Sequence, residues 1–343
     1  MSGSMKLQSY IIRRVLLLLP MLVGITLLSF VLSHAIPADP VIIYLGDRGS
    51  SDPRLVAAFK HEWGLDKPLY EQYVIYLWNL AHGDLGQSIS TRQPVLLDLR
   101  QHVPATVELA VAAMALSLVI GIPLGILAAV NRENVIDQAT RMLSLVGVSV
   151  PVFWLGIIAT LIFYSRLGWV PAPGRTSMLI TSPPFVTGFL PVDALLAGRG
   201  DALRDWLNHL TLPAAVLSAY SLGLITRVTR GSMLEVLGED YVRTAWAKGV
   251  RTWTVRFRHA ARNALIPVIT VAGLGFGGLL SGAVITETIF NWPGLGLYAF
   301  ASASNLDFPA IMGTGIVVAW IYVFVNLVVD VAYAVFDPRI RMG

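Results

Sequence analysis

The chain has 343 residues, of which 55% are hydrophobic and 13% are charged, and its mean hydropathy is +0.67. A soluble domain carries about 25% charged residues, so this composition excludes an ordinary soluble protein and predicts an integral membrane protein with several spans. The formal net charge is +4, and no cysteine is present, which excludes disulfide bonds and thiolate metal sites.

The first apolar run is Val15–Leu32, and it follows three basic residues, Lys6, Arg13 and Arg14. Ser33-His34-Ala35 resembles a cleavage site with small residues, so a signal peptide is the alternative. The apolar run is longer than the roughly 7–15 residues of a signal peptide's hydrophobic region. We therefore interpret residues 1–34 as a cytoplasmic N-terminus followed by a retained transmembrane helix.

Residues 35–103 lack sustained hydrophobicity. Asp52–Trp63 and Lys67–Ala81 are predicted as amphipathic helices, separated by Gly64-Leu65-Asp66. A solvated linker is the simpler alternative, but helical periodicity and several aromatic side chains favour a small folded helical segment. Those aromatic residues are Trp63, Tyr70, Tyr73, Tyr76 and Trp78.

Five further apolar runs each approach the ~20 residues needed to cross the hydrocarbon core. They are Thr106–Val130, Ala139–Ser165, Leu210–Leu224, Ala264–Thr286 and Ala310–Val335. Residues 104–335 thus form a core with five transmembrane helices, and residues 336–343 form a tail. Between the third and fourth of the six spans, residues 166–208 are rich in proline and glycine, which indicates an external loop with one short helix near Asp201–Asn208.

The distribution of charge predicts the orientation. With the N-terminus inside, the cytoplasmic segments contain 15 of the 25 basic residues but only 6 of the 21 acidic ones. Loops rich in Lys and Arg remain on the cytoplasmic side. We therefore expect both termini to be cytoplasmic, and residues 35–103 to be extracytoplasmic.

Paired glycines occur inside the predicted spans, at Gly121 and Gly125, at Gly273 and Gly277, and at Gly278 and Gly282. This G-x-x-x-G spacing lets helix backbones approach closely. Gly273, Gly275 and Gly278 also satisfy G-x-G-x-x-G, so a dinucleotide site is the alternative. That fingerprint needs a preceding strand, whereas these glycines lie in an apolar helical run, so packing is favoured.

Residues for catalysis are nearly absent. The six histidines form no i,i+4 pair for a metal, and no nucleophile and base are arranged within a span. None of the four lysines follows a glycine, so the chain has no Walker A loop. We expect no catalytic residue, no metal site and no cofactor bound by this chain.

The longest polar interruption among the C-terminal spans is residues 232–267. Ser232 and Glu235 have the spacing of a capping box, which predicts the start of a short helix, and Gly238 is predicted to end that helix in the left-handed conformation. A second helix follows. Its start carries the acidic residues Glu239 and Asp240, and one of its faces carries Val242, Ala245, Trp246 and Gly249.

Two runs in this segment carry a family resemblance. They are Tyr241-x-Arg243-Thr244-Ala245-x-Ala247-Lys248-Gly249 and Arg258-His259-Ala260-x-Arg262-Asn263-Ala264, followed by Pro267. The segment resembles the EAA loop of ABC-importer permeases, most closely the dipeptide and oligopeptide branch. In that family the loop forms a coupling helix that docks in a groove of the ATP-hydrolysing subunit. An ordinary basic cytoplasmic loop is the alternative, which the ordered spacing disfavours.

The resemblance implies ATPase-coupling residues: Glu239, Asp240, Tyr241, Arg243, Thr244, Ala245, Trp246, Ala247, Lys248 and Gly249. The branch commonly has Arg where this chain has Trp246, so one contact to the ATPase is expected to differ. A second stretch that recurs in the family is Glu287-Thr288-x-Phe290-x-Trp292-Pro293-Gly294-Leu295-Gly296. It implies that Glu287, Asn291 and Trp292 lie near the external mouth of a translocation pathway. The alternative is a structural turn, with Glu287 as a turn acid and Trp292 as an interfacial anchor.

The resemblance extends over essentially the whole chain and implies an all-α integral membrane fold with six transmembrane helices, the type I ABC-importer permease fold. It also implies a second homologous permease subunit, two ABC ATPase subunits that use ATP and Mg²⁺, an extracytoplasmic peptide-binding protein and a peptide substrate. Lipid of the bacterial inner membrane surrounds such a protein, and no nucleic-acid partner is expected.

Three alternatives stay open at this point. An ion-coupled secondary transporter would need a buried carboxylate relay or broken helices at the midplane, and the sequence contains no convincing relay. An intramembrane enzyme would need a nucleophile and a base, which are missing. Within the family, the cargo of dipeptides or oligopeptides could be replaced by haem or metal chelates.

Overall fold

The computed structural model describes residues 20, 23–31, 46, 50–62 and 64–336. Within these ranges the chain is helical throughout its regular structure and contains no strand, only one isolated bridge between Gln87 and Pro94. The predicted all-α class is therefore confirmed. The predicted tail at residues 336–343 lies outside the described residues from residue 337 onward.

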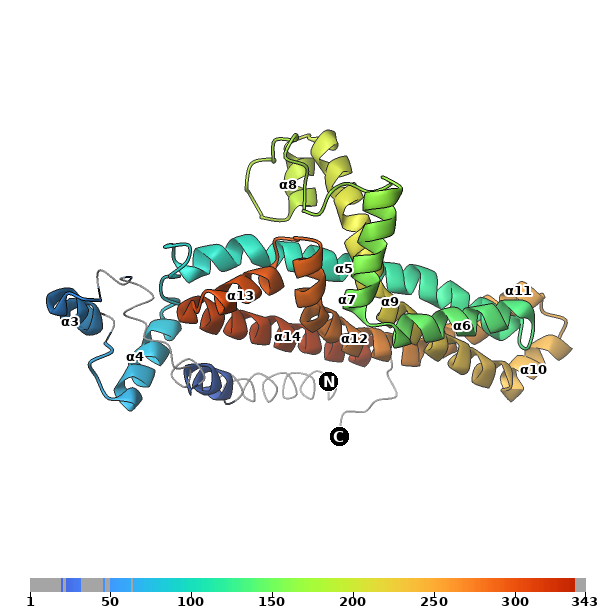
Figure 1. Cartoon of the computed structure of the whole chain (residues 1–343). Coiled ribbons are helices and arrows are strands. Elements are labelled where there is room, and N and C mark those ends of the chain that lie inside the picture. The colour runs from blue at the N-terminus through green and yellow to red at the C-terminus, as the bar shows by residue number, and fades with distance from the viewer. Residues whose placement is uncertain (1–19, 21–22, 32–45, 47–49, 63, 337–343) are drawn as a thin grey trace. The chain divides into compact units, whose positions relative to one another are not determined.

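The two amphipathic helices predicted before the core are confirmed as α3 (Pro53–Glu62) and α4 (Leu69–Ala81) (Figure 1). The helices that follow in chain order are α5 (Val95–Val130), α6 (Val135–Ser149), α7 (Val152–Ala159), the π-helix η1 (Thr160–Arg166), α8 (Leu190–Leu196), α9 (Gly200–Leu237), α10 (Asp240–Ala247), α11 (Thr252–Thr254), the π-helix η2 (Val255–Ala260), α12 (Ala261–Ile289), α13 (Leu295–Ser304) and α14 (Phe308–Phe336).

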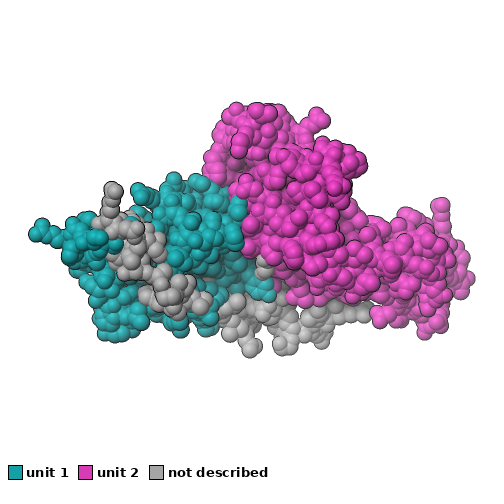
Figure 2. Space-filling model, in the orientation of Figure 1, with its two compact units in different colours: residues 1–103, 297–323 teal, residues 104–296, 324–343 magenta. Residues whose placement is uncertain are grey.

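The chain forms two compact units, shown in different colours in Figure 2. Unit 1 contains residues 1–103 and 297–323, and unit 2 contains residues 104–296 and 324–343. In unit 1, Phe30 packs against Tyr73 and Tyr76 of α4, with ring centroids 5.3 and 6.4 Å apart. In unit 2, α9 packs against both α6 and α12, and apolar side chains of α5, α8, α9 and α12 form the main core.

Four described helical stretches have the length and composition to cross a membrane: Val95–Val130, Gly200–Leu237, Thr252–Leu280 and Phe308–Leu327. The pair Val135–Ser149 and Val152–Arg166 adds a fifth if the bent pair counts as one span. Of the predicted first span, the structure describes Pro20 and the helical residues 23–31, and the rest lies outside the described residues. The count of six spans therefore stays a prediction.

The predicted third span, Ala139–Ser165, corresponds to the bent pair of α6 with α7 and η1. The chain breaks after Ser149, and the two halves form an angle of 104°. Pro151 is the N-cap of α7, with φ −60° and ψ 132°. Proline has no N–H to continue the helical ladder, and it disfavours helical geometry at the preceding residue, so the break occurs there.

The predicted fourth span was too short, and α9 continues well beyond both ends of Leu210–Leu224. The short helix expected near Asp201–Asn208 is the first part of α9. Hydropathy alone missed these ends because they are polar in sequence but carry buried residues, among them Trp206 and Met233. The second span likewise starts earlier than Thr106, at Val95.

Close helix approach is confirmed for one of the predicted glycine pairs. A Cβ on Gly125 of α5 would lie 2.5 Å from the Cβ of Thr229 and 2.7 Å from the carbonyl oxygen of Thr226, both on α9. Two further glycines outside the predicted motifs make similar contacts between α6 and α9, Gly147 and Gly223. By contrast, a Cβ on Gly278 meets nothing within 4 Å among the described residues, so Gly278 makes no such close contact there.

This contrast gives a matched pair of variants. We expect Gly125→Ala to lower the free energy of unfolding by about 2 kcal/mol, because overpacking forces α5 and α9 apart. Gly278→Ala adds the same methyl group in open space and is expected to leave stability unchanged or slightly higher, since Ala favours helix. Thermal melting of the purified variants measures both, and equal melting points would show that this packing is looser than described.

Candidate functional site

The segment that carries the family resemblance begins where α9 ends. Ser232 does not open a new helix as the capping-box spacing predicted, because it lies buried inside α9, which continues to Leu237. Burial of the neighbouring Met233 against η2 and α12 holds this stretch in the helical ladder. Gly238 does end the helix, but in the right-handed conformation with φ −80°. A Cβ there would lie 3.2 Å from the carbonyl oxygen of Glu235.

The second predicted helix is present as α10 (Figure 1). Glu239 is extended, with φ −70° and ψ 147°, and its carbonyl accepts the first helical hydrogen bonds, from Val242 N at 3.1 Å and Arg243 N at 3.2 Å. Its side chain makes no capping hydrogen bond. Asp240 in the first turn places negative charge at the end where unpaired backbone N–H groups favour it.

The end of α10 is a Schellman motif. Gly249 has φ +72°, its N–H donates to the carbonyl of Trp246 at 3.0 Å, and the N–H of Val250 donates to the carbonyl of Ala245 at 3.2 Å. Only glycine adopts this left-handed conformation without a steric penalty, which explains why α10 ends just before Gly249. The cap fixes where the chain turns from α10 toward α11.

The predicted apolar face of α10 divides into an inner and an outer part. Val242 is fully buried and Ala245 is half-buried, where α10 packs on α9 and η2. Trp246 keeps 40% of its surface exposed, and Ala247 and Gly249 are exposed as well. A large aromatic side chain that stays exposed beside small residues leaves a surface suited to contact with another protein.

One hydrogen bond connects the two resemblance-bearing runs. Asn263 Nδ2 of α12 donates to the hydroxyl oxygen of Tyr241 at 2.7 Å. Two side chains of the motif therefore hold α10 beside the start of α12. The ion pair between Arg243 and Asp240, 3.5 Å apart and largely exposed, contributes little by comparison.

A buried charge pair joins α6 to α9 near this segment. Arg230 of α9 donates from Nε to Asp137 Oδ1 at 2.5 Å and from Nη2 to Oδ2 at 2.8 Å, and Glu133 N donates to Oδ2 at 3.0 Å. Asp137 is fully buried. Sequence reasoning missed this pair, because 93 residues separate its members and no motif contains them.

Two candidate residues of the second family stretch, Glu287 and Trp292, belong to a buried hydrogen-bonded cluster at the end of α12. Glu287 accepts hydrogen bonds from the Thr106 hydroxyl at 2.6 Å and from Gly296 N at 2.6 Å. Thr106 Oγ1 in turn accepts from Leu295 N at 2.7 Å. Glu287 has no exposed surface, so its carboxylate fixes the turn after α12 rather than opening to solvent.

Trp292 belongs to the same hydrogen-bonded cluster, where its Nε1–H donates to the carbonyl of Ala105 at 2.8 Å. The ring is fully buried, so the alternative of an interfacial anchor is wrong for Trp292. Asn291 is the one exposed member of the three candidates and adopts φ +47°.

The loop of residues 166–208 is held by a second buried carboxylate, Glu108 of α5. Arg175 donates to Glu108 from Nε at 3.1 Å and from Nη2 at 2.6 Å. Trp206 Nε1 and Leu190 N also donate to this carboxylate, at 3.0 and 2.7 Å. The segment 166–208, which showed no regular pattern in the sequence, is thus tied to α5 and α9.

The start of α8 shows how the loop is folded locally. Asp193 accepts hydrogen bonds from Thr187 N and its hydroxyl, both at 2.8 Å, and from Gly188 N at 3.0 Å. Burial by itself raises the pKa of Asp193, but these hydrogen bonds outweigh it and hold the pKa below its usual value.

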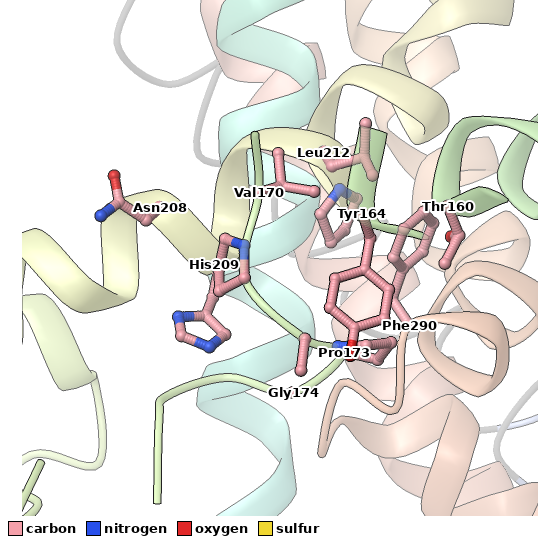
Figure 3. A pocket seen from close by; sticks show the side chains of 12 residues that line it. Thr160, Tyr164, Val170, Pro173, Gly174, Asn208, His209, Leu212 and Phe290 are labelled. Carbon is pink, nitrogen blue, oxygen red and sulfur yellow. The ribbon is translucent and has the colours of Figure 1, made fainter. Parts of the chain in front are cut away.

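A small pocket lies between this loop, η1 and α9 (Figure 3). Tyr164, His209 and Phe290 contribute to its wall. Its volume of about 10 Å³ gives room for about one water molecule, so it is too small for a peptide in this conformation.

These features define a polytopic helical membrane protein with a short exposed helix between two of its long helices. Comparison with known families gives the same class. The family described as "Binding-protein-dependent transport system inner membrane component" matches residues 121–342, and the N-terminal family of the same transport-system membrane components matches residues 7–110. The chain belongs to this family of ABC-transporter permeases.

Individual relatives are similar over nearly the full length. The chain is 48% identical to the probable D,D-dipeptide transport system permease protein DdpB of Escherichia coli K12, with 93% of this chain and 94% of that protein covered. It is 46% identical to the di/tripeptide transport system permease protein DppB of Pseudomonas aeruginosa UCBPP-PA14 and 45% identical to the dipeptide permease DppB of E. coli K12, each with 97% and 98% covered.

A solved structure shares the fold. One chain of the MetNI methionine ABC transporter in an inward-facing conformation superposes with a TM-score of 0.51 at 16% identity, with 70% of this chain and 96% of that chain covered. The predicted ABC-permease fold is thereby confirmed. The alternatives of an ion-coupled transporter and an intramembrane enzyme receive no support from these comparisons.

Proposed function

We propose that this chain is the permease subunit of an ATP-driven importer for dipeptides or short oligopeptides, and that it forms half of the translocation pathway. The similarity to dipeptide permeases over nearly the whole length carries the proposal for the cargo. The named functions of these relatives favour peptides over haem or metal chelates. The sequence has no Walker A loop, so in this proposal separate ATPase subunits hydrolyse ATP and this chain is the translocation subunit.

The complete importer contains a second homologous permease, two ATPase subunits that bind ATP with Mg²⁺, and an extracytoplasmic peptide-binding protein. In the proposed orientation both termini and α10 are cytoplasmic, in the bacterial inner membrane, and residues 35–103 face the binding protein. The residues from Glu239 to Gly249 contact the ATPase, with Trp246 and Ala247 on the contact surface. Glu287 and Trp292 shape the external mouth by fixing the turn after α12, and Asn291 is exposed there.

Transport by the reconstituted importer tests this function. We expect uptake of a labelled dipeptide into proteoliposomes only when both permeases, the ATPase subunits, the binding protein and ATP are present. A matched preparation contains this chain alone with an imposed proton gradient and is expected to show no uptake. Uptake in that second preparation would contradict the proposal and favour ion-coupled transport.

A further inference from the structure

A cavity of about 260 Å³ lies between the middle of α6 and the last third of α9. Three arginines line it, Arg141 from α6 and Arg227 and Arg230 from α9. Only Arg230 is fully neutralised, through its two hydrogen bonds to Asp137. Arg141 Nε lies 3.8 Å from the same carboxylate, and Arg227 makes no ion pair with any described residue. The wall therefore carries three positive charges against one negative charge.

Hydroxyl groups complete the polar wall of this cavity. Thr140, Ser144 and Thr226 line it, and all three are buried. The hydroxyl of Ser144 donates to the carbonyl of Thr140 at 2.8 Å, which leaves its oxygen able to accept only. Thr226 Oγ1 is buried without a hydrogen-bond partner among the described residues. This oxygen lies 3.2 Å from where a Cβ on Gly121 of α5 would stand, so it faces α5, and the arginines rather than this hydroxyl provide the attraction for an anion.

We propose that this cavity binds the phosphate of an anionic phospholipid, between Arg141 and Arg227. Guanidinium groups pair with phosphate oxygens through charge-assisted hydrogen bonds, and a negative ligand offsets the excess positive charge. Basic pockets between membrane helices are a known setting for anionic headgroups.

The surroundings favour a lipid over a free ion. Leu145 lines the cavity and is 57% exposed, and the neighbouring Met142 and Val146 are 67% and 55% exposed. These side chains belong to α6, half of the bent pair that can span the membrane. An acyl chain can therefore lie along exposed apolar side chains while the headgroup occupies the cavity. Inorganic phosphate would satisfy the arginines but leave this apolar face uncovered.

Lipid retention by the full chain tests the proposal. The protein is placed in nanodiscs of phosphatidylcholine, with or without phosphatidylglycerol, and the phosphatidylglycerol that stays bound is counted by native mass spectrometry. We expect a higher melting point with phosphatidylglycerol, and about fivefold weaker retention for each of Arg141→Gln and Arg227→Gln. Arg132→Gln is the matched control, because this exposed arginine near the start of α6 does not line the cavity.

Three outcomes would overturn the assignment. Equal loss of retention in Arg132→Gln would show only general attraction to a charged surface. Sodium phosphate that raises the melting point in phosphatidylcholine discs as much as phosphatidylglycerol does, at matched ionic strength, would assign the cavity to a free ion. Unchanged retention in both cavity variants, with impaired assembly with the second permease, would assign it to an acidic side chain of that partner.

Discussion

Ala247→Glu is expected to reduce ATP hydrolysis stimulated by binding protein and peptide to its unstimulated rate, while the permease still inserts and folds. Ala247 is exposed at the last position of α10, next to the half-exposed Trp246, so nothing within the chain opposes a longer side chain. Seated in an ATPase groove, however, the new carboxylate would be buried without a partner, which costs about 3–5 kcal/mol. The measurement is stimulated ATPase activity of the reconstituted complex.

Two further variants make this experiment specific. Gly249→Asp keeps the site free of clashes, since a Cβ there meets nothing within 4 Å, but it strains a backbone with φ +72° and should also uncouple. Arg251→Glu changes an exposed charge just beyond the Schellman motif and should couple nearly as well as the unaltered chain. If Arg251→Glu uncouples and Ala247→Glu does not, the docking surface is assigned to the wrong residues.

Glu287→Ala is expected to lower the free energy of unfolding by about 3 kcal/mol or more. The substitution leaves the Thr106 hydroxyl and the Gly296 N–H buried without this acceptor, and each such group costs about 1–3 kcal/mol. It also empties space that Gly294 and Gly296 leave for the carboxylate, since a Cβ on either glycine would collide with Glu287. Thermal melting of the purified chain measures the loss.

Glu133→Gln is the control for this variant. It also removes one carboxylate charge, but from a side chain that is 78% exposed and that pairs, among the described residues, only with the exposed Arg132. A change within about 0.5 kcal/mol is therefore expected. Glu287→Gln preserves volume and should fall between the two. If the melting point of Glu287→Ala equals that of Glu133→Gln, the hydrogen-bonded cluster around Glu287 contributes little to stability.

Local sequence signals predicted the features that depend on neighbouring residues. The bounds of α3 and α4 and the start of α10 at Glu239 and Asp240 follow from periodicity and from the placement of acidic residues. The capping-box prediction at Ser232 failed because tertiary packing around Met233 outweighed a local signal. Two π-helices, η1 and η2, also had no signal in the residue pattern.

The polar contacts that fasten the site could not be predicted in the same way. Arg230 counted only as part of a basic cluster, although it is the fixed partner of Asp137. Glu108 and Arg175 are separated by 67 residues, in a span and an irregular loop. The packing of the helices decides which distant ionic groups pair, and a single sequence considered by itself does not reveal that packing. The family resemblance located α10 and Glu287, but it did not predict the hydrogen bonds that fix them in place.

The unbroken length of α9 has a mechanical consequence. At 1.5 Å per residue its 38 residues form a rod of about 57 Å, from Gly200 to the residue before Gly238. The helix contains one proline, Pro213. The other connection of α10 passes through the left-handed Gly249, the short α11 and the π-helix η2. Because a continuous helix is stiffer than a chain with a turn, we expect a displacement of α10 to be transmitted along α9 toward Trp206 rather than through η2.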